Sequence, residues 1–220
     1  MITTLDSGKV VIILQDISTN IHNKVEYLTE LDSVLGDGDH GSNLDRGFGE
    51  VSKRVSQYDG SDVGVLLELA GSTLISSVGG ASGPLYGTMF RKAGKACQGK
   101  SEIGVSDVTR MFQAAEAGIV SLGGAQVGDK TILDSLHPAA EAARVASDSG
   151  VNDLVSAFEK ITSSAEAGLE STKNLVASKG RASYLGERGI GHYDVGAASF
   201  CIILRSMLET LQKIDRAQNS

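Results

Sequence analysis

The sequence predicts an all-α fold, a bundle of helices joined by specialised loops. Apolar residues recur at steps of three or four along most of the chain, which is the period of a helix with one buried face. No clear run of alternating apolar and polar residues, the pattern of a half-buried strand, competes with that period. The chain has 27 glycines, concentrated in residues 36–49, 79–87, 118–128 and 180–196, and these clusters separate the periodic stretches.

The helices can be placed in order along the chain. The first is expected to carry one apolar stripe: Val11, Leu14, Ile17, Ile21, Val25 and Leu28. Residues 9–14 alone have a β preference, but the longer period overrides it. Five Ala- and Leu-rich stretches follow, at 63–77, 83–98, 107–122, 130–147 and 152–178, with Asp62, Ser106 and Asn152 as N-caps. The last helix carries Ala197, Cys201, Leu204, Leu208 and Leu211. The total is about eight helices.

Composition narrows the class of protein. A chain of 220 residues with 41% hydrophobic content can bury one core, so residues 1–220 are expected to form a single domain. The net charge of -7 argues against binding nucleic acid or an anionic membrane surface. Two cysteines in apolar stretches fit a reducing cytoplasm better than a disulfide framework. No signal peptide or membrane span is expected, because no basic region precedes the short N-terminal apolar run.

Three aspartates stand in a glycine-rich segment between two expected helices. Asp32, Asp37 and Asp39 have a D-x4-D-x-D spacing, and carboxylates this close repel one another unless a cation lies among them. Carboxylate ligands favour a hard ion, magnesium or calcium, over zinc. The alternative is a solvated turn, because Asp and Gly are the commonest turn residues.

The spacing excludes a calcium-binding EF-hand. Counted from Asp37, the fifth position is Gly41 and the twelfth is Phe48, so neither a further Asp or Asn nor the closing Glu is present. Magnesium whose coordination is completed by water and phosphate oxygens is the preferred interpretation. His40 stands beside these aspartates and is followed closely by Ser42, so it is expected to face a phosphate.

Two further glycine clusters lie where loops meet helices. In residues 76–87, Ser82 and Pro84 stand near the start of an apolar helix, whose free amides favour an anion; tight packing of small residues is the alternative. Residues 123–131 resemble a phosphate-binding P-loop, but an extra residue separates the last glycine from the Lys-Thr pair and no strand precedes the loop. The commonest nucleotide-binding loop is therefore excluded.

The last cluster, residues 179–196, is long and polar for a loop between two helices. Long ordered loops usually carry function. Arg181 and Arg188 could each offer paired donors to a phosphate. Arg188 follows Glu187, so a surface ion pair is the alternative for it, and Arg181 is the preferred phosphate ligand. No residue, His192 included, is assigned a catalytic role.

Four segments together resemble the L subunit of dihydroxyacetone kinases. They are LDSVLGDGDHGSNLDRGF, SSVGGASGPLYGT, GDKTILDSLHPA and KGRASYLGERGIGH, and they occur in the family order over most of the chain. The resemblance implies a closed barrel of eight antiparallel amphipathic helices. It also implies that a nucleotide, ADP or ATP, and two magnesium ions bind in the loops at one end.

The resemblance also assigns site residues. Asp32, Asp37 and Asp39 match the metal ligands. The residues that match nucleotide contacts are His40, Gly41, Ser42, Asn43, Ala81, Ser82, Gly123, Ile132, Arg181, Asp194, Val195 and Gly196. Many relatives have Asp-Pro-Gly where this chain has Val in the middle, so the loop loses a fixed φ angle. Gly124 and Tyr193 are atypical as well.

The resemblance implies that the chain is half of an enzyme. A separate K subunit would hold the triose covalently, and a phosphohistidine-bearing M subunit would rephosphorylate ADP in place. Phosphoryl transfer needs positioning and charge neutralisation more than a protein nucleophile, which fits this chain. The open alternatives are a kinase subunit that exchanges ATP and acts on a related sugar, a nucleotide-dependent regulator without catalytic activity, and a purely structural helical protein. A homodimer is left open.

Overall fold

The computed structural model describes residues 1–218, and over these residues it consists almost entirely of helices. The helices are α1 (Ser7–His22), α2 (Val25–Leu35), α3 (His40–Val55), α4 (Val63–Ser77), α5 (Ser82–Ala96), α6 (Val105–Gly123), α7 (Leu133–Asp148), α8 (Leu154–Thr172), the 3-10 helix η1 (Arg181–Gly189) and α9 (Val195–Gln218). Two short strands, β1 (Leu5–Asp6) and β2 (Glu102–Ile103), pair antiparallel. The prediction of an all-α fold is confirmed.

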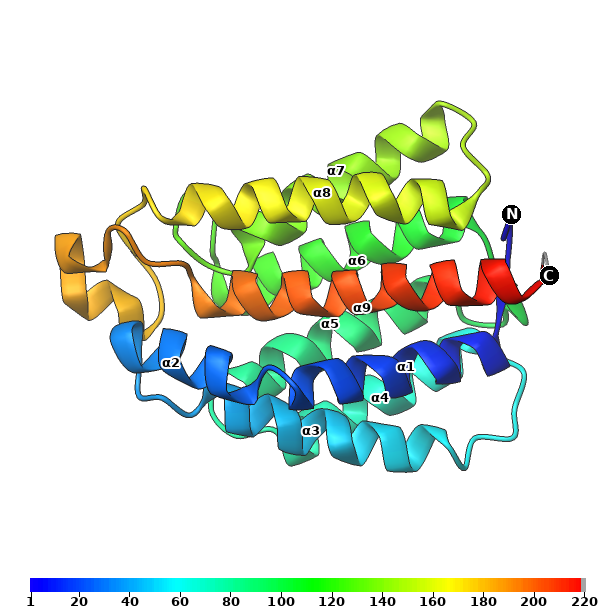
Figure 1. Cartoon of the computed structure of the whole chain (residues 1–220), viewed down its shortest axis with the longest axis horizontal. Coiled ribbons are helices and arrows are strands. Elements are labelled where there is room, and N and C mark those ends of the chain that lie inside the picture. The colour runs from blue at the N-terminus through cyan, green and yellow to red at the C-terminus, as the bar shows by residue number, and fades with distance from the viewer. Residues whose placement is uncertain (219–220) are drawn as a thin grey trace.

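The α-helices lie roughly along the long axis of the molecule (Figure 1). Contacts between helices follow the chain: α1 packs on α3, each helix from α3 to α8 packs on the next, and α9 returns to α1. The loops that follow α2, α4, α6 and α8 gather at one end, opposite both chain termini (Figure 1). A closed barrel requires that each of its helices contact the next and that the last contact the first, as α1 and α3 to α9 do here. The closed barrel itself stays a prediction.

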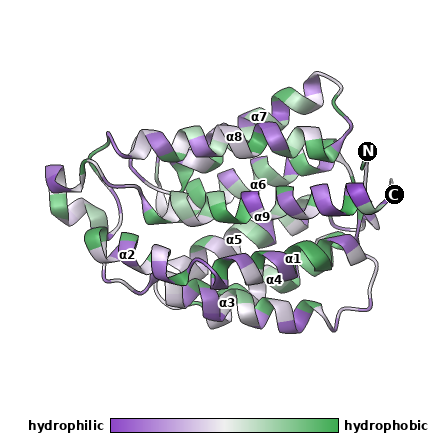
Figure 2. Ribbon diagram, in the orientation of Figure 1, coloured by the Kyte–Doolittle hydropathy of each residue, from purple (hydrophilic) through white to green (hydrophobic). Residues whose placement is uncertain are grey.

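The core is built from the apolar stripes of the helices. Hydrophobic and hydrophilic residues alternate around each helix (Figure 2), as expected for helices that bury one face. Helices α4 and α5 approach most closely through glycines. A Cβ atom on Gly71 would lie 2.7 Å from the Gly87 carbonyl oxygen, and one on Gly64 would lie 2.6 Å from that of Gly94. These glycines are therefore a packing requirement rather than part of a loop.

The first predicted helix is in fact two. Helix α1 ends at His22, and α2 begins at Val25 after a turn in which Lys24 has φ −115° and ψ 10°. Ile21 and Leu28, on either side of the turn, are both fully buried. The apolar period continues across the break because both helices bury the same side, so the period alone could not reveal the break. This division gives nine α-helices within residues 1–218 instead of about eight.

Of the three predicted N-caps, one is confirmed. The Asp62 carboxylate accepts hydrogen bonds from the amides of Gly64 and Val65. Ser106 and Asn152 are wrong: α6 starts after Gly104, and α8 is capped by Asp153, which accepts from the Ser156 amide at 3.0 Å. In both cases a neighbouring Asp makes the bond, Asp107 by accepting from the Gly104 amide. A negative charge at a helix N-terminus is favoured over a neutral group.

Two helices are shorter than predicted. Helix α7 begins at Leu133 rather than at residue 130, and α8 ends at Thr172 rather than at residue 178. Conversely, part of the predicted loop 179–196 forms η1. All three differences lie at the end of the molecule where the interhelical loops gather, so local propensity is overridden there by tertiary contacts.

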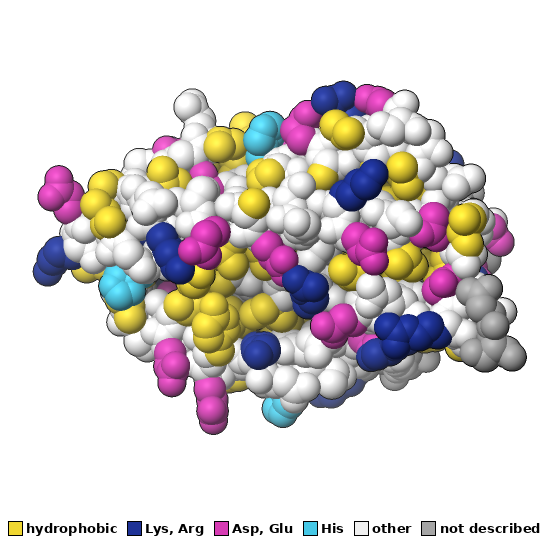
Figure 3. Space-filling view, turned by 45° about the horizontal axis from the view of Figure 1, so that its top comes forward, with side chains coloured by type: hydrophobic (Ala, Val, Ile, Leu, Met, Phe, Trp, Pro, Cys, Tyr) yellow, Lys and Arg dark blue, Asp and Glu magenta, His cyan; other side chains and the backbone are white. Residues whose placement is uncertain are grey.

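The surface mixes charges of both signs. In the view of Figure 3, Lys and Arg side chains lie among Asp and Glu, with apolar side chains between them. That face therefore carries no extended field of one sign. Within residues 1–218, no helix has both the length and the apolar character needed to span a bilayer.

Candidate functional site

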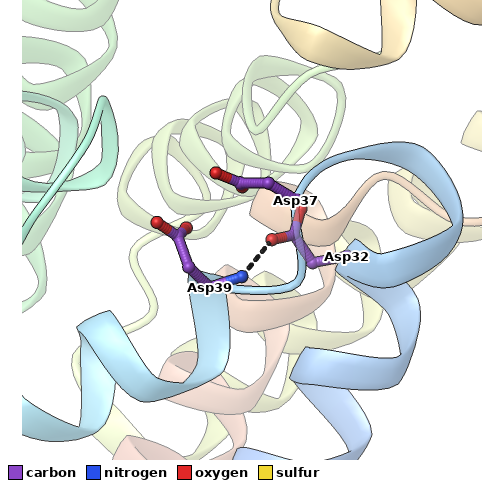
Figure 4. Close-up of side chains that lie close together, drawn as sticks. All are labelled: Asp32, Asp37 and Asp39. Atoms are coloured by element: carbon purple, nitrogen blue, oxygen red, sulfur yellow. Dashed lines mark hydrogen bonds between the residues drawn. The ribbon is translucent and has the colours of Figure 1, made fainter.

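The three aspartates come together at the loop between α2 and α3 (Figure 4). Asp32, Asp37 and Asp39 each offer a carboxylate oxygen, and these oxygens lie within 4.8 Å of one another. Asp32 is buried on the last turns of α2, whereas Asp37 and Asp39 are exposed. Three oxygen donors on one side, with the other side open to solvent, suit a hard divalent ion that keeps water or phosphate ligands.

The sequence of the loop explains this geometry. The Asp32 carboxylate accepts hydrogen bonds from the amides of Asp39 (2.9 Å) and His40 (3.1 Å), which closes the loop back onto α2. A Cβ atom on Gly36 would lie 2.2 Å from an Asp32 carboxylate oxygen, so a side chain there would displace that carboxylate. Gly38 has a φ angle of +74°, in the region that glycine adopts without strain.

Asp39 is placed for a role other than stabilising its helix. It occupies the N-cap position of α3, yet its carboxylate makes no capping hydrogen bond. An Asp at this position usually accepts from an amide in the first turn, which stabilises a helix by about 1 kcal/mol. Here the carboxylate turns toward Asp32 and Asp37 instead (Figure 4). The loop thus forgoes a cap and brings three negative charges together.

The aspartates lie at the wall of a cavity of about 520 Å³, within the usual range for a small-molecule site. Its polar groups come mainly from the α2–α3 loop and from the start of η1. Its apolar walls come from α5, α6 and the α6–α7 loop, and include Leu85, Ile119, Leu122, Ala125 and Ile132. An amphipathic ligand with a charged part and a flat apolar part fits such a division.

The structure brings most of the predicted site residues to this cavity. Its lining includes all three predicted metal ligands and His40, Ala81, Ser82, Gly123, Ile132, Arg181, Asp194, Val195 and Gly196. Arg181, the first residue of η1, forms an ion pair with Asp37. A guanidinium thus lies beside the carboxylates, where it can also meet a phosphate. Arg188 lies outside the cavity and donates to the Leu185 carbonyl.

Three predicted contacts do not line the cavity. Gly41 is buried, and a Cβ atom there would lie 2.4 Å from the Val25 carbonyl oxygen, so this glycine serves helix packing. The Ser42 hydroxyl donates to the Asp39 carbonyl, and the Asn43 side chain accepts from Arg46. All three fall in the first turn of α3, whose remaining side-chain positions face neighbouring helices or solvent.

His40 joins the acidic loop to two other elements. Its Nδ1 lies 3.1 Å from the Ser82 hydroxyl, and its Nε2 lies 2.8 Å from the Ser199 hydroxyl. Ser199 lies in turn 2.6 Å from the Tyr86 hydroxyl, which donates to the Gly196 carbonyl. Burial lowers the pKa of His40, so the ring is neutral at pH 7. A neutral ring whose two nitrogens are both engaged orients its neighbours rather than holding a charge.

Several residues at this site carry no signal in the sequence. Tyr86 and Ser199 are buried, and Lys130 and Thr131 lie in the segment that failed the P-loop test. Tyr86 and Ser199 fall on apolar helical stripes, so their periodicity marks them only as core residues. The sequence predicts that Lys130 begins a helix, whereas its φ angle is +59° and its side chain is buried.

Asp194 is a carboxyl group with an unusual proton affinity. Burial raises its pKa to about 7, and the nearby Asp134 adds to the rise. Its Oδ2 accepts from the Ala197 amide at 2.7 Å. Because the folded state holds this proton more tightly than the unfolded state does, the stabilisation is fully present in acid and is lost as the pH rises from about 4 toward 7.

Replacing Asp194 with Asn is therefore expected to flatten the pH dependence of stability. The amide oxygen of Asn can still accept from the Ala197 amide, but the group no longer titrates. Urea unfolding of both proteins at pH 5, 6 and 7 measures the difference: relative to wild type, the variant gains stability as the pH rises. Asp59→Asn, at an exposed loop position, is the control. The prediction would be contradicted if the free energies of unfolding of the wild type and the variant changed with pH by the same amount.

The comparisons with known proteins agree with the resemblance seen in the sequence. A family model described as the DAK2 domain matches residues 34–209. The ADP-binding subunit DhaL of the PEP-dependent dihydroxyacetone kinase of Escherichia coli K12 is 43% identical over 182 residues, which cover 83% of this chain and 86% of the relative. That of the PEP-dependent dihydroxyacetone kinase 2 of Listeria innocua is 41% identical over 204 residues, covering 91% and 93%.

A solved structure resembles the fold as a whole. The dihydroxyacetone kinase from C. freundii, in complex with AMP-PNP and Mg²⁺, matches with a TM-score of 0.71 and 25% identity. The match covers 91% of this chain but 33% of that one, so this chain corresponds to one part of a larger kinase. Because the family model matches most of the chain, and two relatives are similar over nearly their whole length, the chain belongs to the DAK2 domain family.

Proposed function

We propose that this chain is the nucleotide-carrying subunit of a dihydroxyacetone kinase and that it binds ADP or ATP with magnesium in the cavity described above. The observation that carries the proposal is the cluster of Asp32, Asp37 and Asp39 at the wall of a 520 Å³ cavity. The names of the relatives support it, since both the E. coli and the L. innocua proteins are described as ADP-binding subunits.

The donor set fits magnesium. The three carboxylates supply hard oxygen ligands on one side only, and magnesium usually keeps open positions for water and phosphate oxygens. Bound there, the ion would neutralise charge on the phosphates. We assign the ion to these three aspartates; the resemblance implies a second ion as well.

The remaining residues of the site bind and orient. Arg181 lies beside Asp37 and offers N–H donors to a phosphate, and the Ser82 hydroxyl lies at the N-terminus of α5, where free amides favour an anion. The apolar walls from α5 and α6 suit the adenine ring. No nucleophile or general base is assigned here, because phosphoryl transfer depends mainly on positioning and electrostatic stabilisation.

The proposal extends to the partners. A separate K-type subunit would hold the dihydroxyacetone, and an M-type phosphohistidine subunit would rephosphorylate ADP without its release. The description of both relatives as PEP-dependent supports this arrangement. It also predicts activity only in the presence of both partners. The alternative, a subunit that exchanges ATP, is distinguished by whether purified protein retains ADP through gel filtration.

Removal of magnesium is expected to abolish nucleotide binding. Three carboxylates and a polyphosphate cannot lie together without a cation, since like charges in contact repel strongly. Isothermal titration with ADP is expected to give a saturable signal in magnesium and none after magnesium has been removed with EDTA. Calcium serves as a comparison, because its larger ionic radius suits a site with more ligands. Equal affinity with and without magnesium, or no binding in either condition, would overturn the proposal.

A further inference from the structure

Lys130 is held in an unusual way at the site end of the molecule. Within residues 1–218, it is the one non-glycine residue with a positive φ angle, +59°, and only 1% of its surface is exposed. Long charged side chains are seldom buried to this extent unless they are paired. A strained backbone persists only where surrounding contacts over-determine it. Contacts of the side chain are therefore expected to stabilise this backbone conformation.

The Lys130 ammonium lies among four backbone carbonyl oxygens. Its Nζ is 2.9 Å from the oxygen of Thr172, 3.2 Å from that of Leu175, and 2.7 Å from those of Gly189 and His192. An ammonium has three N–H donors, so it satisfies all of its hydrogen-bonding capacity here without a carboxylate partner. Burial lowers the pKa of Lys130, and nearby Asp194 opposes that shift.

These four carbonyls belong to both ends of one connection. Thr172 is the last residue of α8, and Leu175 follows it by three residues in the connecting segment. Gly189 and His192 lie where η1 ends and the chain turns toward α9. One ammonium thus ties the beginning of the segment 173–193 to its end, and both to the α6–α7 loop.

Several contacts hold this segment to the rest of the molecule: η1 packs on α2, Ala177 is buried, and the Tyr193 hydroxyl donates to Glu170 of α8. Gly189 is the one buried residue of η1. Ser178 bonds to Asp129, the neighbour of Lys130, and Arg181 pairs with Asp37, which belongs to the acidic loop. The Arg181 ion pair is exposed, and such pairs contribute little to stability. The Lys130 ammonium differs from that ion pair in being buried and in contacting both ends of the segment at once.

We propose that Lys130 is a positioning residue, whose ammonium fixes the segment 173–193 so that Arg181 and Asp194 line the nucleotide cavity. It acts through its carbonyl partners and need not touch the ligand. The expected effect on nucleotide binding rests on the proposed function, whereas the expected effect on the segment 173–193 does not. The positive φ angle follows from it, because the backbone turns so that the side chain can enter the carbonyl cage.

The test compares Lys130→Met with Lys160→Met, an exposed position on α8. Met keeps the length and the apolar stem but removes all three donors. Hydrogen exchange in the absence of nucleotide is expected to speed up at the amides of residues 176–192 in Lys130→Met alone, with α1 and α9 unchanged in both variants. Unchanged exchange in residues 176–192 overturns the inference, whether or not the protein binds ADP.

Nucleotide binding gives the second measurement. Lys130→Met is expected to release ADP roughly 10- to 100-fold faster than Lys160→Met, the size of effect typical for residues that orient the direct ligands. If the wild type binds no ADP, the proposed function fails, and the exchange experiment still tests whether the Lys130 ammonium holds the segment 173–193 in place. If the wild type binds ADP and both variants release it equally fast, the positioning role fails.

Chemical rescue separates the charge from the packing. Lys130→Ala leaves a space that propylammonium can fill, and this ion is expected to restore slow exchange in residues 176–192, whereas propan-1-ol is not. Equal recovery with both compounds, or with neither, overturns the assignment to the ammonium. If the other variants do not fold, Lys130→Gly replaces them, because glycine accepts the positive φ angle without strain. Fast exchange at residues 176–192 in this variant supports the positioning role of the ammonium. Slow exchange there overturns it.

Discussion

Asp39→Asn is expected to abolish magnesium-dependent ADP binding while the nucleotide-free protein stays as stable as the wild type or becomes more stable. The affinity loss is expected to be roughly 100-fold or more, which corresponds to about 2.7 kcal/mol or more. The reason lies in the geometry. The Asp39 carboxylate makes no capping hydrogen bond and lies near two other carboxylates, so without a cation it contributes repulsion rather than support.

Asp39 is a better test position than Asp32. The Asp32 carboxylate accepts two backbone amides, so its replacement would disturb the loop as well as the ion. Titration calorimetry in magnesium measures the affinity, and thermal unfolding without nucleotide measures the stability. Asp45→Asn is the matched control on the same helix, because Asp45 pairs with His22 and lies outside the cavity. Wild-type affinity in Asp39→Asn would mean that the ion is not held by this cluster.

Phe48→Ala is expected to give the largest loss of stability, about 3–5 kcal/mol. Phe48 is fully buried in α3, and its ring packs edge-on against Tyr86 at 6.4 Å and Phe90 at 6.0 Å, both on α5. Truncation removes the buried ring and leaves a cavity between two helices, which the surrounding helices fill only in part. For a chain of this size the loss corresponds to a fall in Tm of roughly 6–20 °C.

Thermal unfolding measures the effect, with Val65→Ala on the exposed side of α4 as the control. Phe48→Leu is expected to lose less, because it keeps much of the buried volume. Tyr86 lines the cavity beside the acidic loop and hydrogen-bonds Ser199 and the Gly196 carbonyl. Under the proposed function, saturating ADP and magnesium are expected to recover part of the lost Tm, because they bind the folded state and not the unfolded state. A fall in Tm no larger than that of Val65→Ala would contradict the packing argument.

The residues that the sequence located most surely are those of the acidic loop. Like-charge repulsion makes Asp32, Asp37 and Asp39 informative at their spacing alone, because three carboxylates in one short loop need an explanation. The structure brings their oxygens together, as that argument requires. Arg181 could be singled out as well, since its guanidinium offers paired donors to a phosphate and no acidic residue adjoins it in the sequence. The binding roles of these residues stay predictions until a ligand is measured.

Other features were hidden because sequence patterns are local. The break at Lys24 keeps the same apolar face, so the period of α1 and α2 reads as one helix. The caps of α6 and α8 depend on which of several neighbouring polar groups reaches the free amides. A single residue of difference at a helix end lies within the normal reach of such side chains.

The sequence by itself determined the helical class, the place of the loops and the three carboxylates, because period, glycine clusters and charge spacing act over a few residues. Only the tertiary structure decided that Lys130 is a buried tie rather than a helical residue, and that Tyr86 and Ser199 support His40. Those roles depend on carbonyls and hydroxyls that are distant in the chain. Lys130 contacts the carbonyl of Gly189 only once the helices have packed, and no local sequence pattern predicts a contact between residues so far apart.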